Sequence, residues 1–297
     1  MIAIYEPLYR PGQTLVEPAF KPLLITDNNR PEWREFAILV DMYRRGLHRQ
    51  HRFTGLFSPK FGLKTGLSGA QFIDFVNANA DAEVCFVNPF PQLAYISFNV
   101  WMQGENAHPG LVARAQALLD ACGIAIRVAE LPRHGPDLLC YCNFWVGTEQ
   151  FWEDYVGGVL VPMAEFLEAH PEHPACRDVL KTTVHIPPSP FLPFIVERLF
   201  SSYLSLTRSP PLARGFPTDP LQFCLNDFER RLVIHNRDRI DSADQTGVFS
   251  DEVKKDMRFA SEVWQDFTLA YYGDRPHPHS GGSFQSVGAG RPTPRIT

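Results

Sequence analysis

The sequence lacks a long hydrophobic segment and a leader-like N-terminus. Its most apolar run, FLPFIVERLFSSYLSL, is interrupted by Pro193, Glu197 and Arg198, so no window reaches the roughly 18 uninterrupted apolar residues that a membrane span requires. The N-terminal stretch MIAIYEPLYRPGQ has no basic region, apolar core or small-residue cleavage site of the kind that marks a signal peptide. We therefore expect a cytoplasmic protein, and peripheral contact with the inner face of the membrane stays open.

An excess of basic charge and a paired-cysteine pattern are also missing. The formal net charge of -5 leaves no basic stripe to neutralise phosphates, so nucleic acid is not an expected partner. The six cysteines are scattered singly, apart from Cys140 and Cys142, and we expect them to be reduced and mostly buried. His170, His173 and Cys176 have a metal-like spacing, but prolines break the segment and no fourth ligand is near, so no metal site is expected.

What the sequence does contain is an alternation of strand-like and helix-like stretches, which predicts an α/β fold with a largely parallel sheet flanked by helices. The expected strands are 2–7, 53–57, 83–87, 124–129 and 138–145. The expected helices include 31–47, 69–78 with Ser68 as N-cap, 95–103, 108–121, one that begins after Thr148, and most of 220–272 with an interruption at 241–247. We expect an α/β domain over 1–219, a helical extension packed on it over 220–273, and a disordered Gly/Pro/Ser-rich tail over 274–297.

Polar and cationic residues follow the second expected strand. The segment FTGLFSPKFGLKTGLS places Ser58, Lys60, Lys64 and Thr65 beyond the carboxyl end of that strand. Donors and cations at such a position suit an anionic ligand such as a diphosphate. The alternative is a solvated loop whose glycines serve turns.

A second group of candidates follows the third expected strand, after Asn88. The segment NVWMQGENAHPGL sets Asn99, Gln103, Glu105 and His108 within a short span. A carboxylate beside an imidazole can act as general base for an acceptor hydroxyl if its pKa is tuned toward neutrality. The alternatives are that Glu105 is an ordinary surface charge and that His108 caps the following helix.

A third candidate is the charged pair Glu197 and Arg198 inside the apolar segment FIVERLFSSYL. Charges on a mostly apolar helix must be paired or must face a cleft. A site role for the pair therefore competes with a charge pair at the solvent-exposed edge of the helix.

The order of these segments resembles that of bacterial cell-surface polysaccharide glycosyltransferases, of the capsule or O-antigen type, with a GT-A-like (Rossmann-like) fold. The resemblance rests on GLFSPKF within 53–61, the strand at 83–88, the aromatic segment CNFWVGTEQFW at 142–152, and ERLFSSYL at 197–204. It covers about residues 1–206.

The resemblance implies a nucleotide-sugar donor lying across the ends of the first and third strands, and an acceptor that is a glycan or a lipid-linked glycan. The expected donor-binding residues are Tyr5, Ser58, Lys60, Lys64, Asn88, Asn99, Gln103 and Arg198. Asn143, Trp145 and Trp152 are expected on the acceptor side, although aromatic side chains of this kind also serve as plain core. Glu105, Glu197 and His108 are the expected catalytic residues.

One departure from the family pattern affects the expected chemistry. Such enzymes place an Asp-x-Asp motif after the third strand to hold Mn²⁺ or Mg²⁺, whereas this sequence has Asn88-Pro89-Phe90 there. We therefore expect metal-independent sugar transfer with no cofactor, in which Lys60, Lys64 or Arg198 offsets the charge of the leaving group. The alternative is a catalytically inactive relative that binds carbohydrate or assists assembly. A hydrolase has little support, because no G-x-S-x-G, H-E-x-x-H or Walker motif is present.

Overall fold

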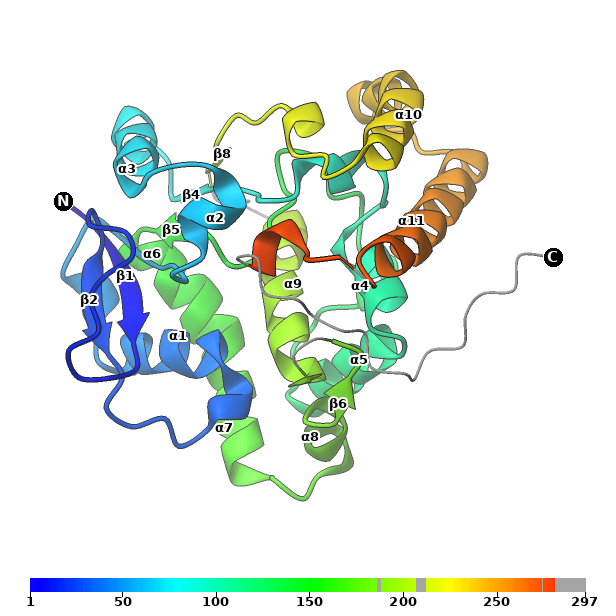
Figure 1. Ribbon diagram of the computed structural model, residues 1–297. Helices are drawn as coiled ribbons and strands as arrows, with labels where there is room; N and C mark the ends of the chain where they lie inside the picture. Colours follow the sequence, from blue (N-terminus) through cyan, green and yellow to red (C-terminus); the bar gives the residue numbers. More distant parts are fainter. Residues whose placement is uncertain (186–187, 207–211, 274, 281–297) are drawn as a thin grey trace.

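The computed structural model describes residues 1–185, 188–206, 212–273 and 275–280. It is an α/β protein built on a mostly parallel six-stranded sheet with the strand order β2-β1-β3-β5-β4-β8 (Figure 1). The strands are β1 (Ile2–Leu8), β2 (Lys21–Leu24), β3 (Phe53–Leu56), β4 (Val84–Phe86), β5 (Trp145–Gly147) and β8 (Ala213–Gly215). β1 pairs parallel with β2 and β3, and β4 pairs parallel with β8, whereas β5 runs antiparallel between β3 and β4.

Side chains of the central strands alternate between two hydrophobic clusters, as the two-residue period of a strand requires. In β4, Val84 and Phe86 enter the larger cluster while Cys85 enters the smaller one, and in β5 Trp145 and Val146 separate in the same way. Both faces of the sheet are therefore buried, as expected for strands covered by helices on each side.

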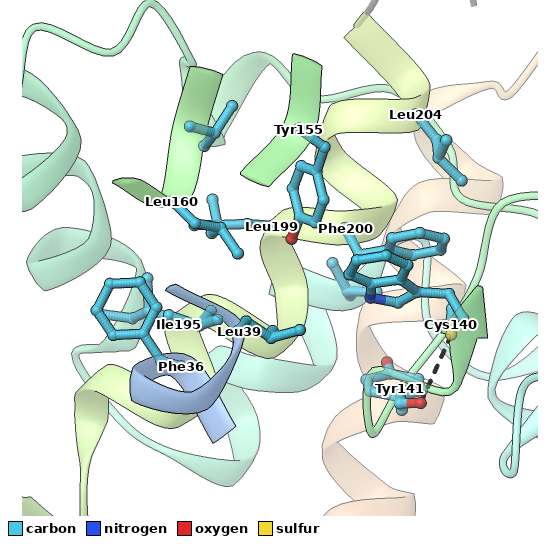
Figure 2. Packing of buried hydrophobic residues seen from close by; sticks show 14 of the residues in the cluster. Phe36, Leu39, Cys140, Tyr141, Tyr155, Leu160, Ile195, Leu199, Phe200 and Leu204 are labelled. Carbon is cyan, nitrogen blue, oxygen red and sulfur yellow. Dashed lines mark hydrogen bonds between the residues drawn. The ribbon is translucent and has the colours of Figure 1, made fainter. Parts of the chain in front are cut away.

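The larger cluster is centred on α9 (Phe191–Leu206), the most buried helix near the sheet. Figure 2 shows Ile195, Leu199 and Phe200 of this helix among Phe36, Leu39, Tyr155 and Leu160. Phe200 stacks on Trp145 of β5, with ring centroids 5.6 Å apart. Full burial of a side chain of this size contributes on the order of 2 kcal/mol relative to exposure, so α9 is fixed firmly against the sheet.

The remaining elements surround this core. The α-helices are α1 (Glu35–Arg44), α2 (Phe61–Thr65), α3 (Gly69–Ala78), α4 (Val100–Ala107), α5 (Leu111–Ala121), α6 (Glu149–Phe151), α7 (Val161–Ala169), α8 (Pro174–Val179), α10 (Asp227–Thr246) and α11 (Asp251–Tyr271). A π-helix, η5 (Trp152–Leu160), joins α6 to α7. The 3-10 turns are η1 (Pro31–Trp33), η2 (Leu47–Arg49), η3 (Pro91–Tyr95), η4 (Val128–Glu130), η6 (Pro220–Gln222) and η7 (Pro278–Ser280), and β6 (Thr182–Thr183) pairs with β7 (Ser189–Pro190).

Several local predictions are confirmed. Ser68 caps α3 through a capping box in which its hydroxyl accepts from the amide of Gln71 and the Gln71 side chain accepts from the amide of Ser68. Thr148 caps the helix that carries Phe151, and the first three expected strands are present, β1 one residue longer than expected and β3 and β4 slightly shorter. All six cysteines are free.

Two predicted strands are wrong. Residues 124–129 form no strand and end in the turn η4, and of the segment 138–145 only Trp145 belongs to a strand. The reason in the second case is backbone conformation: Cys142 and Asn143 have φ angles of 64° and 53°, which a pleated strand does not allow. The chain here forms a turn rather than the alternating strand that Cys140 and Cys142 suggested.

The predicted helix bounds also need correction. The helix expected over 31–47 is divided at Arg34, whose φ of 50° separates η1 from α1. The helix expected over 95–103 is instead the turn η3 followed by α4, because Asn99 caps α4 by accepting from the amides of Trp101 and Met102. α5 begins at Leu111 rather than His108.

The C-terminal helices pack against the α/β part. α10 continues through most of the predicted interruption at 241–247 and ends at Thr246, and the break begins at Gly247, whose φ is 67°. Ser261 of α11 shares a hydrogen bond of 2.8 Å with Ser97, and the hydroxyl of Tyr95 donates to Asp241 at 2.9 Å. In the region expected to be a disordered tail, residues 275–280 (red in Figure 1) include η7, and His279 lies with its ring centroid 5.0 Å from that of Phe90. Residues 274 and 281–297 lie outside the described residues.

Candidate functional site

A cavity of about 710 Å³ lies beyond the carboxyl ends of β3 and β4. α2 follows β3 and contributes Lys64 to its wall, and Phe90 follows β4. Its other walls come from α4, α9, α11, the 141–142 turn, the β6–β7 segment and residues 275–277. Ligands of open α/β sheets bind at the carboxyl ends of the strands, where neighbouring connections diverge. The cavity therefore lies where such a fold is expected to bind a ligand.

Lys64 is one of the two cations of this cavity that the sequence indicates. Its ammonium donates to the Sγ of Cys142 at 3.0 Å, and among the described residues no carboxylate oxygen lies within 4.0 Å of it. Burial raises the pKa of the Cys142 thiol to about 11, against the opposing effect of Lys64, so the sulfur is a neutral acceptor at neutral pH. Burial opposes the charge of Lys64, but Cys142, Glu197 and Glu35 together raise its pKa, so Lys64 presents a positive charge at the cavity wall.

Arg198 is the second cation, and it is only 2% exposed. Its Nε donates to the carbonyl of Val100 at 2.9 Å, Nη1 to the carbonyl of Phe194 at 2.8 Å, and Nη2 to Oε1 of Gln103 at 2.6 Å. The nearest carboxylate, that of Glu197, is 3.7 Å from Nη1, and its side chain is 23% exposed. Three of the five guanidinium N–H groups therefore donate hydrogen bonds to α4 and α9, and these bonds fix the position of the charge.

Gly104 makes room for this arginine. A Cβ at position 104 would overlap Nε of Arg198 and would also crowd Leu111. The absence of a side chain at this one position of α4 lets the guanidinium reach the carbonyl of Val100.

His108 and Glu197 are the two expected catalytic residues that line the cavity. The His108 ring stacks on Phe194 with centroids 3.8 Å apart, and its Nδ1 lies 3.4 Å from the hydroxyl of Thr183. His108 is buried, whereas Glu197 is partly accessible from the cavity. Glu197 is therefore the carboxylate of this cavity that a substrate hydroxyl can reach.

The turn that carries Tyr141, Cys142 and Asn143 closes one wall. Left-handed φ angles at two consecutive residues other than glycine are uncommon, and strain of this kind concentrates at functional sites. Tyr141 is 3% exposed, and Cζ of Arg198 lies 5.8 Å from its ring centroid. Burial raises the pKa of the Tyr141 phenol, so its hydroxyl keeps its proton.

α11 and the segment after it form the opposite wall. Trp264 lines the cavity, and its Nε1 donates at 2.9 Å to Glu229, a carboxylate that is 1% exposed. Burial raises the pKa of Glu229, against hydrogen bonds from Leu225, Trp264 and Gln92. Arg275 and His277 also line the cavity, and burial lowers the pKa of His277.

Five residues expected from the sequence meet in this cavity: Lys64, Gln103, His108, Glu197 and Arg198. Two others from the same stretch do not. Glu105 accepts from the backbone amides of Gly110 at 2.6 Å and Val112 at 2.9 Å, so its carboxylate caps the start of α5. Glu105 and Asn99 line a separate groove of about 640 Å³ beside α4 and α11. The expected pairing of Glu105 with His108 in one site is not what the structure shows.

The remaining expected donor residues lie outside the cavity wall. Tyr5 is buried in β1, Ser58 accepts from the amide of Lys60 at 3.3 Å, and Lys60 is exposed just before α2. Asn88 is 6% exposed; its Oδ1 accepts from the amide of Phe90, and its Nδ2 has no partner among the described residues. Of these four, Asn88 is separated from the cavity residue Phe90 only by Pro89.

The aromatic residues expected on the acceptor side belong to the core. Trp145 is 1% exposed and Trp152 is fully buried, with its Nε1 donating to the carbonyl of Thr54 at 2.8 Å. Asn143 is partly buried, and its Oδ1 has no partner among the described residues. None of the three lines the cavity. Their role is packing and turn formation.

The cavity residues that sequence reasoning missed are mainly Tyr141, Cys142, Trp264, Tyr272, Arg275 and His277. The last four come from segments assigned to a helical extension and a disordered tail. A signal was present in part: Trp264 stands in a largely polar helix, and a tryptophan there requires a partner surface. The histidines of the Pro-rich segment gave no such signal.

Within the part of the chain that the structure describes, no three His, Cys, Asp or Glu side chains are grouped as a metal site would require. None of the described helices is long and apolar enough to cross a membrane. Comparisons with protein-family models, with curated proteins and with solved structures find no match to this chain.

Proposed function

We propose that this chain is a glycosyltransferase that moves a sugar from a nucleotide-sugar donor to a glycan or lipid-linked acceptor in bacterial surface polysaccharide synthesis. The observation that carries the proposal is the pair of cations, the half-buried Lys64 and the buried Arg198, at a cavity beyond the carboxyl ends of β3 and β4. The sequence resemblance to enzymes with a GT-A-like fold supports the same reading, and so does the mostly parallel sheet.

Charge balance favours an anionic ligand. Lys64, Arg198 and Arg275 line the cavity, and Glu197 is the one carboxylate among its described lining residues. One carboxylate faces three cations there, and a bound diphosphate would offset the remaining positive charge. Because Asn88-Pro89-Phe90 replaces the Asp-x-Asp motif, the proposal assigns compensation of the leaving diphosphate to Lys64 and Arg198 rather than to a divalent cation.

The aromatic lining suits the uncharged parts of a nucleotide sugar. Phe90, Phe194, Trp264 and Tyr272 line the cavity together with Tyr141. Flat apolar faces beside polar groups bind nucleobases by stacking and sugars through their C–H faces. A cavity of about 710 Å³ is within the range that holds a small-molecule ligand of this size.

The reaction we propose is direct displacement at the anomeric carbon. An acceptor hydroxyl forms the new C–O bond, the bond between the anomeric carbon and the diphosphate oxygen breaks, and the hydroxyl proton passes to the carboxylate of Glu197. Glu197 takes the role of base in place of Glu105, whose carboxylate is occupied by the amides of α5. The nucleoside diphosphate leaves with its charge opposite Lys64 and Arg198.

The test is thermal stabilisation by UDP, GDP, CMP and dTDP, each with and without Mn²⁺, followed by a transfer or donor-hydrolysis assay with the nucleotide sugar that corresponds to the best ligand. We expect one nucleotide to raise the melting temperature whether or not Mn²⁺ is present, and turnover to follow. Stabilisation without turnover supports the second candidate, an inactive relative that binds carbohydrate, which the missing Asp-x-Asp motif favours. No response to any nucleotide refutes the proposal.

A further inference from the structure

Tyr141 carries a polar atom that has no hydrogen-bond partner in the part of the chain that the structure describes. Its hydroxyl is buried and has no hydrogen-bond partner among the described residues, although the residue lines the cavity. Buried hydroxyls normally have a partner, and each exception calls for an explanation. A ligand in the cavity is one source of the missing partner.

The surroundings of this side chain indicate what kind of group would satisfy it. The guanidinium of Arg198 lies 5.8 Å from the ring centroid, Lys64 is hydrogen bonded to the adjacent Cys142, and Phe90 packs edge-on at 5.9 Å. The phenol keeps its proton, because burial raises its pKa. A proton donor beside the Arg198 guanidinium, in a cavity wall that also carries Lys64, favours an acceptor with negative charge.

We propose that Tyr141 is a ligand-binding residue whose hydroxyl donates a hydrogen bond to a phosphate oxygen of the bound nucleoside diphosphate. The inference rests on the proposed function and deepens it, because it adds a third, uncharged donor beside Lys64 and Arg198 and restricts the contact to the diphosphate. The left-handed turn at Cys142 and Asn143 fixes the position of Tyr141 at the wall.

Tyr155 offers a matched control. Its hydroxyl is likewise buried and without a partner among the described residues, but it lies in the packed core beside Leu199 and Phe200 and does not line the cavity (Figure 2). Replacing either tyrosine with phenylalanine removes one unpaired hydroxyl, and we expect each change to keep or raise the melting temperature of the ligand-free protein by about 2 °C. Only one of the two should alter ligand binding.

The experiment compares wild type, Tyr141→Phe and Tyr155→Phe by calorimetric titration with UDP, GDP and dTDP, with the parent nucleosides and with inorganic pyrophosphate. We expect Tyr141→Phe to weaken the best diphosphate and pyrophosphate by about 10- to 100-fold and to leave the weak binding of the nucleoside unchanged. Tyr155→Phe should bind like wild type.

The outcomes separate the inference from the function beneath it. If wild type binds a nucleoside diphosphate and Tyr141→Phe binds it equally well, the inference is wrong and the proposed function stands. Equal weakening by both variants, or weakening of the nucleoside as well, also overturns it, since the hydroxyl then acts through the core or meets another part of the ligand. If wild type binds none of the probes, the proposed function fails and the inference with it.

Discussion

The ammonium group of Lys64 lies 3.0 Å from the sulfur of Cys142, a residue 78 positions further along the chain. The contact joins α2, which follows β3, to the turn that precedes β5. It holds the lysine at the cavity wall while leaving its charge unneutralised, because the thiol has a pKa of about 11. A local sequence motif, SPKFGLK, and a distant turn therefore create one anion-binding position together.

Lys64→Met should weaken the best nucleoside diphosphate by about 10- to 100-fold, because it removes a charge from a half-buried position at the cavity wall. Stability should change little, since a cation with no carboxylate oxygen within 4.0 Å among the described residues is replaced by an apolar chain of similar length. Lys60→Met is the matched control: it lies four residues earlier, is exposed, and is absent from the cavity wall. Titration of both variants checks the prediction, and equal losses in the two would contradict it.

Substitution of the two glutamates proposed from the sequence, Glu197 and Glu105, should have different effects on activity and stability. Glu197→Gln should lower the transfer rate by about 10²- to 10⁴-fold with nucleotide affinity retained, as expected for loss of a general base. Glu105→Gln should keep its activity but lose about 1 kcal/mol of unfolding free energy, because one of the two amide hydrogen bonds to the carboxylate is weakened. Steady-state rates and urea denaturation of both variants are the measurements. Full inactivation by Glu105→Gln in a stable protein would return the base role to Glu105.

Gly104→Ala should displace Arg198, since the new Cβ would occupy the space of Nε. We expect a loss of about 1–3 kcal/mol of stability from overpacking, together with weaker diphosphate binding. Gly158→Ala is the control within a helical element: its Cβ would have only an ordinary contact at 3.9 Å, so this variant should fold and bind like wild type. Chemical denaturation and nucleotide titration test both. Unchanged affinity in Gly104→Ala would show that the position of Arg198 does not matter for binding.

The sequence predicts those elements whose signals are local. Strands β1, β3 and β4 follow from short, mostly apolar segments bounded by turn residues, and the capped start of α3 follows from Ser68. The resemblance to a glycosyltransferase family and the function it implies remain predictions. The strand order and the antiparallel placement of β5 depend on contacts between distant residues, which no local pattern encodes.

The sequence predicted only those parts of the cavity wall that come directly after a strand or carry an isolated charge. Lys64, His108 and Arg198 are examples. Glu105 and His108 are close in sequence, but the prediction that they share one site is wrong. The break between α4 and α5 turns the Glu105 carboxylate toward the amides of α5. The sequence predicts a strand at Tyr141, whereas the structure has a turn with left-handed φ angles at Cys142 and Asn143. Apart from the asparagine, the residue types there do not indicate such angles. Trp264 and Arg275 enter the wall only because α11 folds back onto α4.

Acid sensitivity should depend on His134, which is fully buried between the amide of Val100 and the hydroxyl of Ser205. Burial and, to a smaller extent, Arg133 lower its pKa from 6.5 to about 3. The unfolded chain therefore binds a proton between pH 6.5 and 3 that the folded chain does not, so stability is fully present above pH 6.5 and falls as the pH falls. The complete shift corresponds to on the order of 4 kcal/mol.

Glu153, whose pKa is lowered to about 2 chiefly by its hydrogen bonds with Tyr43, Arg49 and His48, contributes only below about pH 4.5, where its unfolded form begins to protonate. Between pH 6.5 and 4.5 Glu153 therefore contributes little, and the contribution of Glu229, whose pKa burial raises, is common to wild type and the histidine variants. In this window His134→Gln should show a flatter loss of unfolding free energy than wild type, whereas His235→Gln, at an exposed position of α10, should retain the wild-type slope. Urea denaturation at pH 7.0, 6.0, 5.5 and 5.0 measures the slopes. Parallel curves for wild type and His134→Gln would mean that His134 is protonated in the folded protein.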